Sequence, residues 1–505
     1  MANLVGGEFF DNLVGTEDRD IIRGNGGSDN LFGNGGNDDL YGGGGDDYLE
    51  GGAGLDKLYG GDGFDYFDYA NPAHIVRGEI IDGGAGIDTI GVRPSRPGEL
   101  FDFTGAKLTS IEQFAGAGAI GRFTFAQAAG LTTIEAFNLE LAGSGAFTLN
   151  SDLLLRGVVR LVSYDTTLTI GSATNLYGGI SVTGSNGTDT VIGNGAANTL
   201  SGEGGADKLY GEGGGDFLIG GLGRDQLYGG AGRDQFIIYS SAEMQGGEVY
   251  DGGADLDTLR VFASVNMLGV TITGIEDLVA EGGAQLSGAA SQFGGYRAIT
   301  ADSFNIVDGG TATIAGVVAV NTINIRAAGV VLDLSASSSF SSNSTTIYGW
   351  TTSDTVVGSN RSESIYGGRG NDVLDGGAGD DVLVGGEDRD TLTGGAGADT
   401  FVYTQRNDSG VNKSDTITDF TAGDILDLSL IDADSTTDED DAFIFVVEGS
   451  DSPGELFWSY DSTTNITTLR GDVDGGGVLL NDVNSVDFQI FFTGNVTGLG
   501  AAVIL

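Results

Sequence analysis

The sequence contains no cysteine and only 4 prolines among its 505 residues. Without cysteine, the fold cannot depend on disulfide bonds or on thiolate metal sites. Basic residues are also scarce, with 22 Lys and Arg against 72 Asp and Glu and a formal net charge of −50. Nucleic acids and anionic membrane surfaces would repel such a chain, whereas cations are its natural partners.

Several familiar signals are missing as well. The N-terminus from Met1 to Glu8 lacks the basic and apolar regions of a cleaved signal peptide. No apolar run reaches the ~18 residues that a membrane-spanning helix needs. The single histidine, His74, has no partner for a catalytic or metal site, and neither HExxH nor GxSxG occurs. We therefore expect no transmembrane segment and no enzyme activity, and we interpret His74 as a surface residue.

Glycine, in contrast, is abundant, with 92 residues that follow a nine-residue frame. Nineteen repeats of the form GGxGxDxUx, where U is apolar, fall into three blocks; GNGGNDDLY from Gly33 is one of them. All nineteen have glycine at position one and an apolar residue at position eight. Position six is aspartate in all but two, which carry Asn198 and Glu363. A flexible linker has no reason to keep such a phase, so the period indicates a repeat architecture.

Each repeat has a simple physical interpretation. Its first six residues form a tight turn that needs the backbone freedom of glycine, and its last three form a short strand with the apolar side chain inward. Two repeats make one coil. The predicted apolar stacks are Leu31, Leu49 and Phe67 on one side and Ile22, Leu40 and Leu58 on the other. The predicted acidic ladders are Asp29, Asp47 and Asp65, opposite Asp38 and Asp56.

The acidic ladders predict bound metal. Two bare carboxylates about 5 Å apart repel by roughly 3 kcal/mol at an effective dielectric of 20, so a column of them needs cations between its rungs. Oxygen ligands without His or Cys favour multiple Ca²⁺ ions over zinc or copper, and Mg²⁺ is less suited because it demands octahedral geometry.

The predicted carboxylate ligands are Asp11, Asp20, Asp29, Asp38, Asp47, Asp56, Asp65, Asp88, Asp189, Asp207, Asp216, Asp225, Asp234, Asp257, Asp354, Asp372, Asp381, Asp390 and Asp399. The predicted turn glycines are Gly24, Gly26, Gly33, Gly35, Gly42, Gly44, Gly51, Gly202, Gly204, Gly211, Gly220, Gly367, Gly376 and Gly385.

The fold class is therefore predicted to be all-β, with parallel β-roll or β-solenoid blocks separated by β-rich spacers. For the spacers we favour a continuing β-helix, which needs no separate edge protection, while a compact β-sandwich stays open. The predicted segments are a first block at 1–68, a spacer at 69–183, a second block at 184–237, a spacer at 238–348, a third block at 349–402 and a C-terminal cap with a secretion region at 403–505.

The GGxGxDxUx blocks resemble the repeats-in-toxin (RTX) family of Gram-negative bacteria. SDTITDF from Ser414 and GDILDL from Gly423 resemble the segment that closes the last β-roll in that family, and LRGDVDG from Leu469 resembles the C-terminal region of serralysin-type secreted proteins. This resemblance implies export by a type I secretion system, in which an ABC transporter reads an uncleaved C-terminal signal. It also implies a secreted, extracellular or cell-surface location.

The predicted function is that of a secreted calcium-binding protein that folds on extracellular Ca²⁺ and is not an enzyme. We expect a structural, surface-layer-like, matrix or adhesive role, with further copies of the chain or a cell-surface polysaccharide as partners. Because the repeats begin at Gly6, we expect no effector domain before them. Two alternatives stay open: a membrane-active host-interaction protein, and a polysaccharide-modifying enzyme, for which we find no acid–base constellation.

Overall fold

The structure is a computed structural model of the 505-residue chain. It describes residues 1–149, 158–163, 165–170, 179–337, 339–340, 345–434, 441–446, 453–474, 487–497 and 502–505. The chain divides into two compact bodies, which are described separately. The N-terminal body is Met1–Ile238, Gly247–Thr258 and Val270–Gly274, and the C-terminal body is Tyr239–Gly246, Leu259–Gly269 and Ile275–Leu505.

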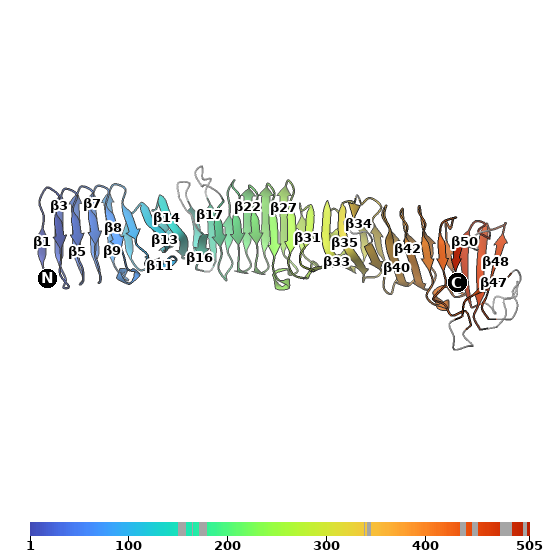
Figure 1. Ribbon diagram of the computed structural model, residues 1–505. Coiled ribbons are helices and arrows are strands. Elements are labelled where there is room, and N and C mark those ends of the chain that lie inside the picture. Colours follow the sequence, from blue (N-terminus) through green and yellow to red (C-terminus); the bar gives the residue numbers. More distant parts are fainter. Residues whose placement is uncertain are drawn as a thin grey trace. The chain divides into compact units, whose positions relative to one another are not determined.

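The N-terminal body consists of short strands that pair in parallel from coil to coil (Figure 1). One sheet holds β1 (Asn3–Val5), β3 (Ile21–Gly26), β5 (Asp39–Gly44), β7 (Lys57–Asp62), β9 (Ile80–Ala85) and β12 (Lys107–Thr109). Another holds β15 (Gly145–Leu149), β17 (Thr166–Ile170), β19 (Thr190–Ile192), β22 (Lys208–Gly213), β25 (Gln226–Ala231), β27 (Val249–Ala254) and β30 (Thr271–Thr273).

A further series of strands in this body completes the coils. It comprises β2 (Asn12–Val14), β4 (Asn30–Phe32), β6 (Tyr48–Glu50), β8 (Tyr66–Tyr69), β10 (Thr89–Val92), β11 (Glu99–Asp102), β13 (Gln113–Thr124), β14 (Thr133–Ala142), β16 (Val158–Leu161), β18 (Ser181–Thr183), β20 (Thr199–Ser201), β23 (Phe217–Ile219) and β26 (Gln235–Ile238). The smaller elements are η1 (Pro72–His74), α1 (Phe125–Ala128), β21 (Gly204–Gly205) and β24 (Leu222–Gly223).

The register confirms the two predicted apolar stacks. Leu31 pairs with Leu49 and Leu49 with Phe67 across β4, β6 and β8. Ile22, Leu40 and Leu58 align in the same way across β3, β5 and β7. All six side chains are fully buried. Strands β4 and β6 have the predicted three residues, but β3, β5 and β7 have six, because they continue into the first turn positions of the next repeat.

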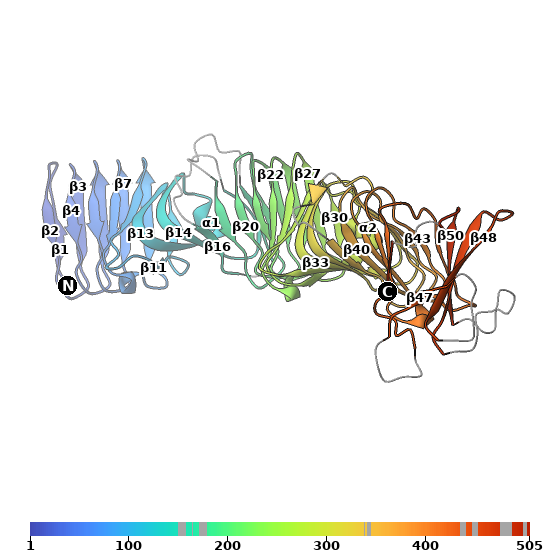
Figure 2. The same ribbon diagram turned by 45° about the vertical axis from the view of Figure 1, so that its right-hand side comes forward.

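The spacer of the N-terminal body continues the solenoid. Strand β13 pairs in parallel with β10, β11 and β14, and β14 pairs with β16. This pairing confirms the preferred β-helical interpretation over a sandwich. The short helix α1, whose N-terminus is capped by the Thr124 side chain, packs against β13 and β14 (Figure 2). The spacer core is aromatic: Phe103, Phe114 and Phe123 are buried with ring centroids 5.1–6.1 Å apart.

The C-terminal body is built from the same kind of parallel coils. One series is β29 (Val265–Asn266), β31 (Asp277–Ala280), β32 (Gln285–Ala289), β33 (Ala298–Asp308), β35 (Val317–Ile325), β37 (Ser339–Phe340), β38 (Thr345–Tyr348), β40 (Glu363–Arg369), β42 (Val382–Glu387), β44 (Thr400–Val402), β46 (Ile425–Asp427) and β51 (Val503–Ile504). Strand β28 (Thr258–Val261) has its first residue, Thr258, assigned to the N-terminal body and its other residues assigned to the C-terminal body.

The second series in this body ends in an antiparallel cap. It contains β34 (Gly310–Thr313), β36 (Val330–Asp333), β39 (Thr355–Val357), β41 (Val373–Asp375), β43 (Thr391–Thr393), β45 (Asp415–Ile417), β47 (Ile444–Phe445), β48 (Glu455–Asp461), β49 (Ile466–Asp472) and β50 (Phe488–Thr493). Strand β49 is antiparallel to both β48 and β50. The short helices are η2 (Ser241–Glu243), α2 (Ala290–Phe293) and η3 (Arg406–Ser409). None of the described helices has the length and hydrophobicity to span a membrane.

Candidate metal centre

Hydrogen bonds join the aspartates of each acidic ladder. The backbone N–H of Asp29 donates to Oδ1 of Asp47 at 2.7 Å, and that of Asp47 donates to Oδ1 of Asp65 at 2.9 Å. On the opposite ladder, the N–H of Asp38 donates to Oδ1 of Asp56 at 2.8 Å. The structure thus brings together the aspartates that the repeat frame aligns. In each rung, meaning each aspartate of a ladder, Oδ1 accepts a hydrogen bond from the backbone of the preceding coil.

The other carboxylate oxygen is buried and in most rungs has no hydrogen-bond partner. Within the described residues this holds for Oδ2 of Asp29, Asp38, Asp47, Asp56, Asp65, Asp88, Asp207, Asp216, Asp225, Asp234, Asp257, Asp354, Asp372, Asp381, Asp390, Asp399 and Asp415. Burying an unpaired anionic oxygen is strongly unfavourable, and native proteins rarely contain such atoms without a ligand that explains them. A regular series of them therefore indicates a series of cation sites.

The position-one glycines complete a cradle around this oxygen. A Cβ on Gly24 would collide with Oδ2 of Asp29 and would lie 2.6 Å from the carbonyl oxygen of Gly42. A Cβ on Gly42 would likewise meet Asp47 and the Gly60 carbonyl. A carboxylate oxygen and a backbone carbonyl therefore converge on a space that any side chain would fill. Such an all-oxygen donor set fits Ca²⁺.

The predicted glycines fall into two groups. Those at position one lie beside the aspartate of their own repeat; they are Gly24, Gly33, Gly42, Gly51, Gly202, Gly211, Gly220, Gly367, Gly376 and Gly385. Those at position three do not have that aspartate as their nearest neighbour; they are Gly26, Gly35, Gly44 and Gly204. The structure thus places the first group, and not the second, beside the aspartate of the same repeat; Gly26 and Gly35 lie nearest to Glu8 and Glu17 of the preceding coil.

Burial changes the acidity of the ladders. It raises the pKa of Asp38 to about 7 and that of Asp207 to about 8, and the adjacent ladder carboxylates add to this effect. The pKa of Asp65 is raised to about 7 for the same two reasons. Protons and cations therefore compete for these oxygens near neutral pH.

Three ladder residues lie beyond the predicted set. Glu112 accepts from the Asp88 N–H at 2.9 Å, Asp415 from the Asp390 N–H at 2.8 Å and Asp424 from the Asp399 N–H at 3.1 Å. Burial raises the pKa of Asp415 to about 9. All three follow their partner by more than the 18 residues of a regular coil, so the nine-residue frame does not find them. A search for an acid 23 to 25 residues after the last regular rung would have found Asp415 and Asp424.

Glu79 ends one ladder of the first block without a following aspartate. It is fully buried in the coil after Asp56, where it accepts a hydrogen bond from the Tyr69 hydroxyl at 2.8 Å and another from the Val76 N–H at 3.1 Å. Burial raises its pKa to about 8 despite these two bonds. Glu79 therefore holds a proton at neutral pH, and the ladder ends on a neutral group. His74, in η1, is half-buried.

A separate acidic cluster lies near the C-terminal cap. One oxygen from each of Asp472, Asp474 and Asp487 lies within 4.8 Å of the others. Asp487 accepts from the Val473 N–H at 2.8 Å, and its other oxygen lies 3.8 Å from Arg406. Asp487 follows Asp474 by 13 residues and joins the cluster because β49 and β50 pair antiparallel.

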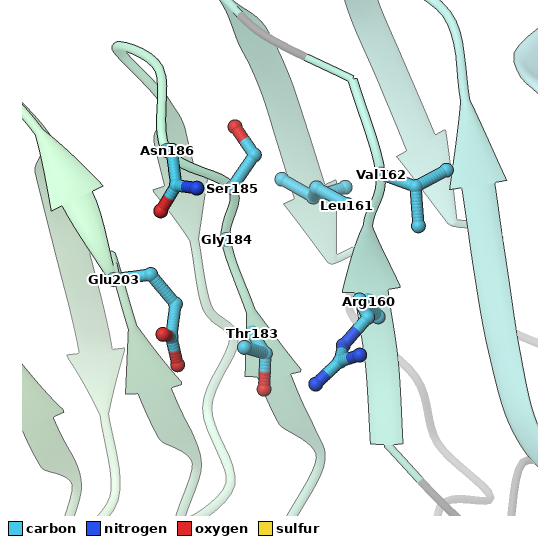
Figure 3. Close-up of a pocket in the computed structure, with 8 residues that line it drawn as sticks. All are labelled: Arg160, Leu161, Val162, Thr183, Gly184, Ser185, Asn186 and Glu203. Atoms are coloured by element: carbon cyan, nitrogen blue, oxygen red, sulfur yellow. The ribbon is translucent and has the colours of Figure 1, made fainter.

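A pocket of about 290 Å³ lies at the start of the second block. It is lined by Arg160, Leu161, Val162, Thr183, Gly184, Ser185, Asn186 and Glu203 (Figure 3). In the strand register, Arg160 pairs with Glu140 on one side and with Thr183 on the other. The Arg160 guanidinium and the Glu203 carboxylate lie on opposite sides of Thr183 (Figure 3).

Comparison with known families agrees with this geometry. The model of the RTX calcium-binding nonapeptide repeat matches in four copies, at residues 5–40, 32–67, 183–218 and 210–237. The model of the peptidase M10 serralysin C terminal matches residues 341–504, which include the third block. A β-solenoid with stacked acidic turns and these two matches defines a calcium-binding repeat protein. The chain belongs to the RTX proteins and has a serralysin-like C-terminal region, which is typical of type I secretion substrates.

Other comparisons are less informative. No curated protein matches the chain. Among solved structures, the solution structure of the AlgE6R3 subunit from the Azotobacter vinelandii mannuronan C5-epimerase is 26% identical, covers 31% of this chain and 80% of that chain, and has a TM-score of 0.23. At this score the two structures do not superpose as wholes, so the likeness carries no argument about function.

Proposed function

We propose that this RTX protein folds when its aspartate ladders take up several calcium ions outside the cell. The supporting observation is the series of buried Oδ2 atoms that have no hydrogen-bond partner. When bound, calcium supplies the positive charge that adjacent rungs need. At ten times its Kd each site contributes about 1.4 kcal/mol, so ten sites contribute about 14 kcal/mol. That sum is comparable with the whole stability of an ordinary domain.

The affinity of such sites for calcium determines where the chain folds. Extracellular calcium modules have Kd values of roughly 10⁻⁴–10⁻³ M, far above cytosolic calcium. Inside the cell, the ladders of a chain with net charge −50 repel one another, and the chain stays expanded. Export by a type I transporter through the serralysin-like region then delivers it to calcium. Folding and secretion are thereby coupled.

Outside the cell, the protein acts as a non-enzymatic structural or adhesive component. The carboxyl groups with strongly raised pKa values, such as Asp207 and Asp390, lie in ladders and face other rungs of the same ladder. Catalytic acids are instead found in clefts, beside the space where a substrate binds. Repeated coils with such ladders suit a scaffold.

Circular dichroism with sedimentation velocity tests the proposal, with Ca²⁺ titrated from chelator to about 10 mM, above the Kd range of extracellular sites. We expect a cooperative transition from coil to β-structure with compaction, and larger species at high calcium if the chain assembles. A chain that is already β-rich and compact in chelator would overturn metal-coupled folding. Monomers throughout would remove the support for assembly.

Adhesion to a cell-surface polysaccharide is a second role, favoured by the pocket at Arg160. Arg160 makes no ion pair with any described residue, and hydroxyl, amide and carboxylate groups line the same pocket. A guanidinium suits a sugar carboxylate, and the other groups suit sugar hydroxyls. Retention on an immobilised carboxylated polysaccharide should fall for Arg160→Ala and not for Arg224→Ala, an exposed arginine outside the pocket. Equal retention of both variants and the parent would exclude this role.

Two alternatives remain to be separated from the scaffold role. Dye leakage from lipid vesicles in the presence of calcium would favour a membrane-active protein. Turnover of an anionic polysaccharide would favour an enzyme, and it would contradict the absence of catalysis that we propose.

A further inference from the structure

The first coil of each block has a different turn from the coils that follow it. In every repeat of the later coils, the residue at position two has a positive φ, for example 77° at Asn25 and 119° at Gly43. The six first-coil residues at position two do not have a positive φ; they are Gly7, Thr16, Ser185, Asn194, Trp350 and Ser359. Two turn conformations therefore alternate along the chain, and the first one marks the start of each block.

The first-coil conformation closes the turn on itself. The N–H of Thr16 donates to Oδ2 of Asp20 at 2.6 Å, and the Thr16 hydroxyl adds a second bond at 2.8 Å. The other closed turns join Gly7 to Asp11 at 2.6 Å, Ser185 to Asp189 at 2.7 Å, Asn194 to Asn198 at 3.0 Å and Ser359 to Glu363 at 3.1 Å. The oxygen that has no partner in later coils is thus already hydrogen bonded here.

The later-coil conformation leaves the same oxygen open. All thirteen later-coil repeats of the three blocks have an Oδ2 without a partner at position six. A positive φ at position two accompanies each of them. Asp354 is the exception among first coils: Trp350 precedes it by four residues, and its Oδ2 has no partner.

The type of residue at position two depends on the place of its coil within the block. A Cβ on Gly43 would collide with the carbonyl of Asn25 in the preceding coil, and a Cβ on Gly61 would collide with that of Gly43. Only glycine therefore fits above a coil that already has the open turn. Side chains at position two in the first two blocks are confined to the first two coils, where Thr16 and Asn25 are examples.

From these observations we propose that calcium binds the open turns of the second and later coils, and not the closed turns of the first coils. The inference rests on the proposed function, because it specifies which turns take the calcium ions. It also explains the two irregular repeats. Asn198 and Glu363 are the only residues at position six that are not aspartate, and both lie in closed turns. Asp11, Asp20 and Asp189, which the repeat pattern alone includes among the ligands, become structural hydrogen-bond acceptors.

Calcium stoichiometry of the full-length chain, measured by isothermal titration calorimetry, tests the proposal with the variants Asp20→Asn and Asp38→Asn. The two residues are neighbouring rungs of one ladder, and the asparagine amide keeps an acceptor for Thr16, as Asn198 does for Asn194. We expect Asp20→Asn to bind as many ions as the parent, whereas Asp38→Asn loses at least one ion. Loss of an ion in Asp20→Asn would overturn the inference.

A reverse substitution keeps the test valid if Asp38→Asn does not fold. Asn198→Asp restores the aspartate of the repeat pattern inside a closed turn. We expect it to bind no additional ion, and a gained ion would overturn the inference. If the parent chain binds no calcium, the proposed function itself fails. If the parent binds calcium and Asp20→Asn loses an ion, only the assignment of the closed turns is contradicted.

Discussion

The first block and the spacer that follows it, both in the N-terminal body, stabilise the same type of coil by different means. Each is parallel from strand to strand and each has a fully buried core. In the block, the core is a thin column of single side chains such as Leu40, and like charges are stacked at the turns. In the spacer, aromatic rings such as Phe103 and Phe123 fill the core.

The charges differ in the same way. On the spacer, Arg122 lies 3.1 Å from Asp102 and 2.5 Å from Glu140, so opposite charges alternate between adjacent strands. This part of the spacer therefore pairs its charges without an added ion, whereas the block contains a surplus of buried negative charge. If the proposed function holds, a solenoid combines coils that depend on metal with coils that depend on side-chain packing.

Removing calcium should give the largest difference in stability between the first block and the spacer. In chelator, we expect amides of residues 21–69 to lose their protection against hydrogen exchange, because the ladders repel once the cations are gone. Amides of residues 99–142 should keep much of theirs, because their core is aromatic. Hydrogen exchange with mass spectrometry, with and without calcium, gives the measurement. Equal loss in both regions would show that the spacer cannot fold alone.

Acid should partly replace calcium in the block. Because the folded-state pKa values of Asp38 and Asp65 are raised to about 7, the folded block holds protons between pH 4 and 7 that the unfolded chain has lost. Its metal-free stability is therefore present at low pH and is lost as pH rises through 7. Circular dichroism of metal-free protein should show more β-structure at pH 5 than at pH 8, and no difference would contradict these shifts.

With calcium present, the pH dependence is reversed, and lower pH weakens the block. Protons then compete with the ion, so the calcium concentration at half-saturation should rise as pH falls below 7. Asp20 gives an internal contrast, because hydrogen bonds from Ala2 and Thr16 keep its pKa lowered in spite of its burial.

Truncating the aromatic core should weaken the spacer alone. Phe103→Ala removes a fully buried ring that contacts Phe114 and Phe123, and it should destabilise the spacer by about 3–5 kcal/mol. Chemical denaturation in saturating calcium measures the loss. Phe64→Ala, an exposed phenylalanine of the first block, is the control, with an expected change within about 0.5 kcal/mol. A large shift in calcium half-saturation for Phe103→Ala would show that the two regions are coupled.

The smallest effect is expected from the spacer charges. Glu140→Gln removes one of the two acidic partners of Arg122, whose side chain is 29% exposed, so about 1 kcal/mol or less should be lost. The effect should shrink at high salt, because solvent ions screen exposed charges. Denaturation at low and high salt measures both quantities. A salt-independent loss would mean that packing of the side chain, and not its charge, is responsible.

Much of the block could be predicted from the sequence, because its period fixes both spacing and direction. Once Leu31 and Leu49 are 18 residues apart in a strict frame, their stacking follows, and so does that of Asp29 and Asp47. The two turn conformations were not predicted. A signal was present, since side chains occur at position two only in early coils, but its meaning depends on the carbonyl of the coil before.

The spacer was predicted only in outline. Its strands are β-rich in sequence, but no fixed period relates Phe103 to Phe123, so the sequence does not reveal that their rings stack at 5.3 Å. Glu79 was missed for a related reason. Five extra residues separate Asp65 from Asp88, beyond the usual 18, and Glu79 lies in that longer connection, outside the frame.

The one-way hydrogen bonds of the ladders constrain how such a protein evolves. Each Asp N–H donates to the carboxylate 18 residues later, so a gene duplication that adds a single nine-residue repeat would exchange the two ladders for everything after it. A whole coil of 18 residues can be added without changing which ladder any later aspartate joins, whereas a single added repeat moves each of them to the opposite ladder.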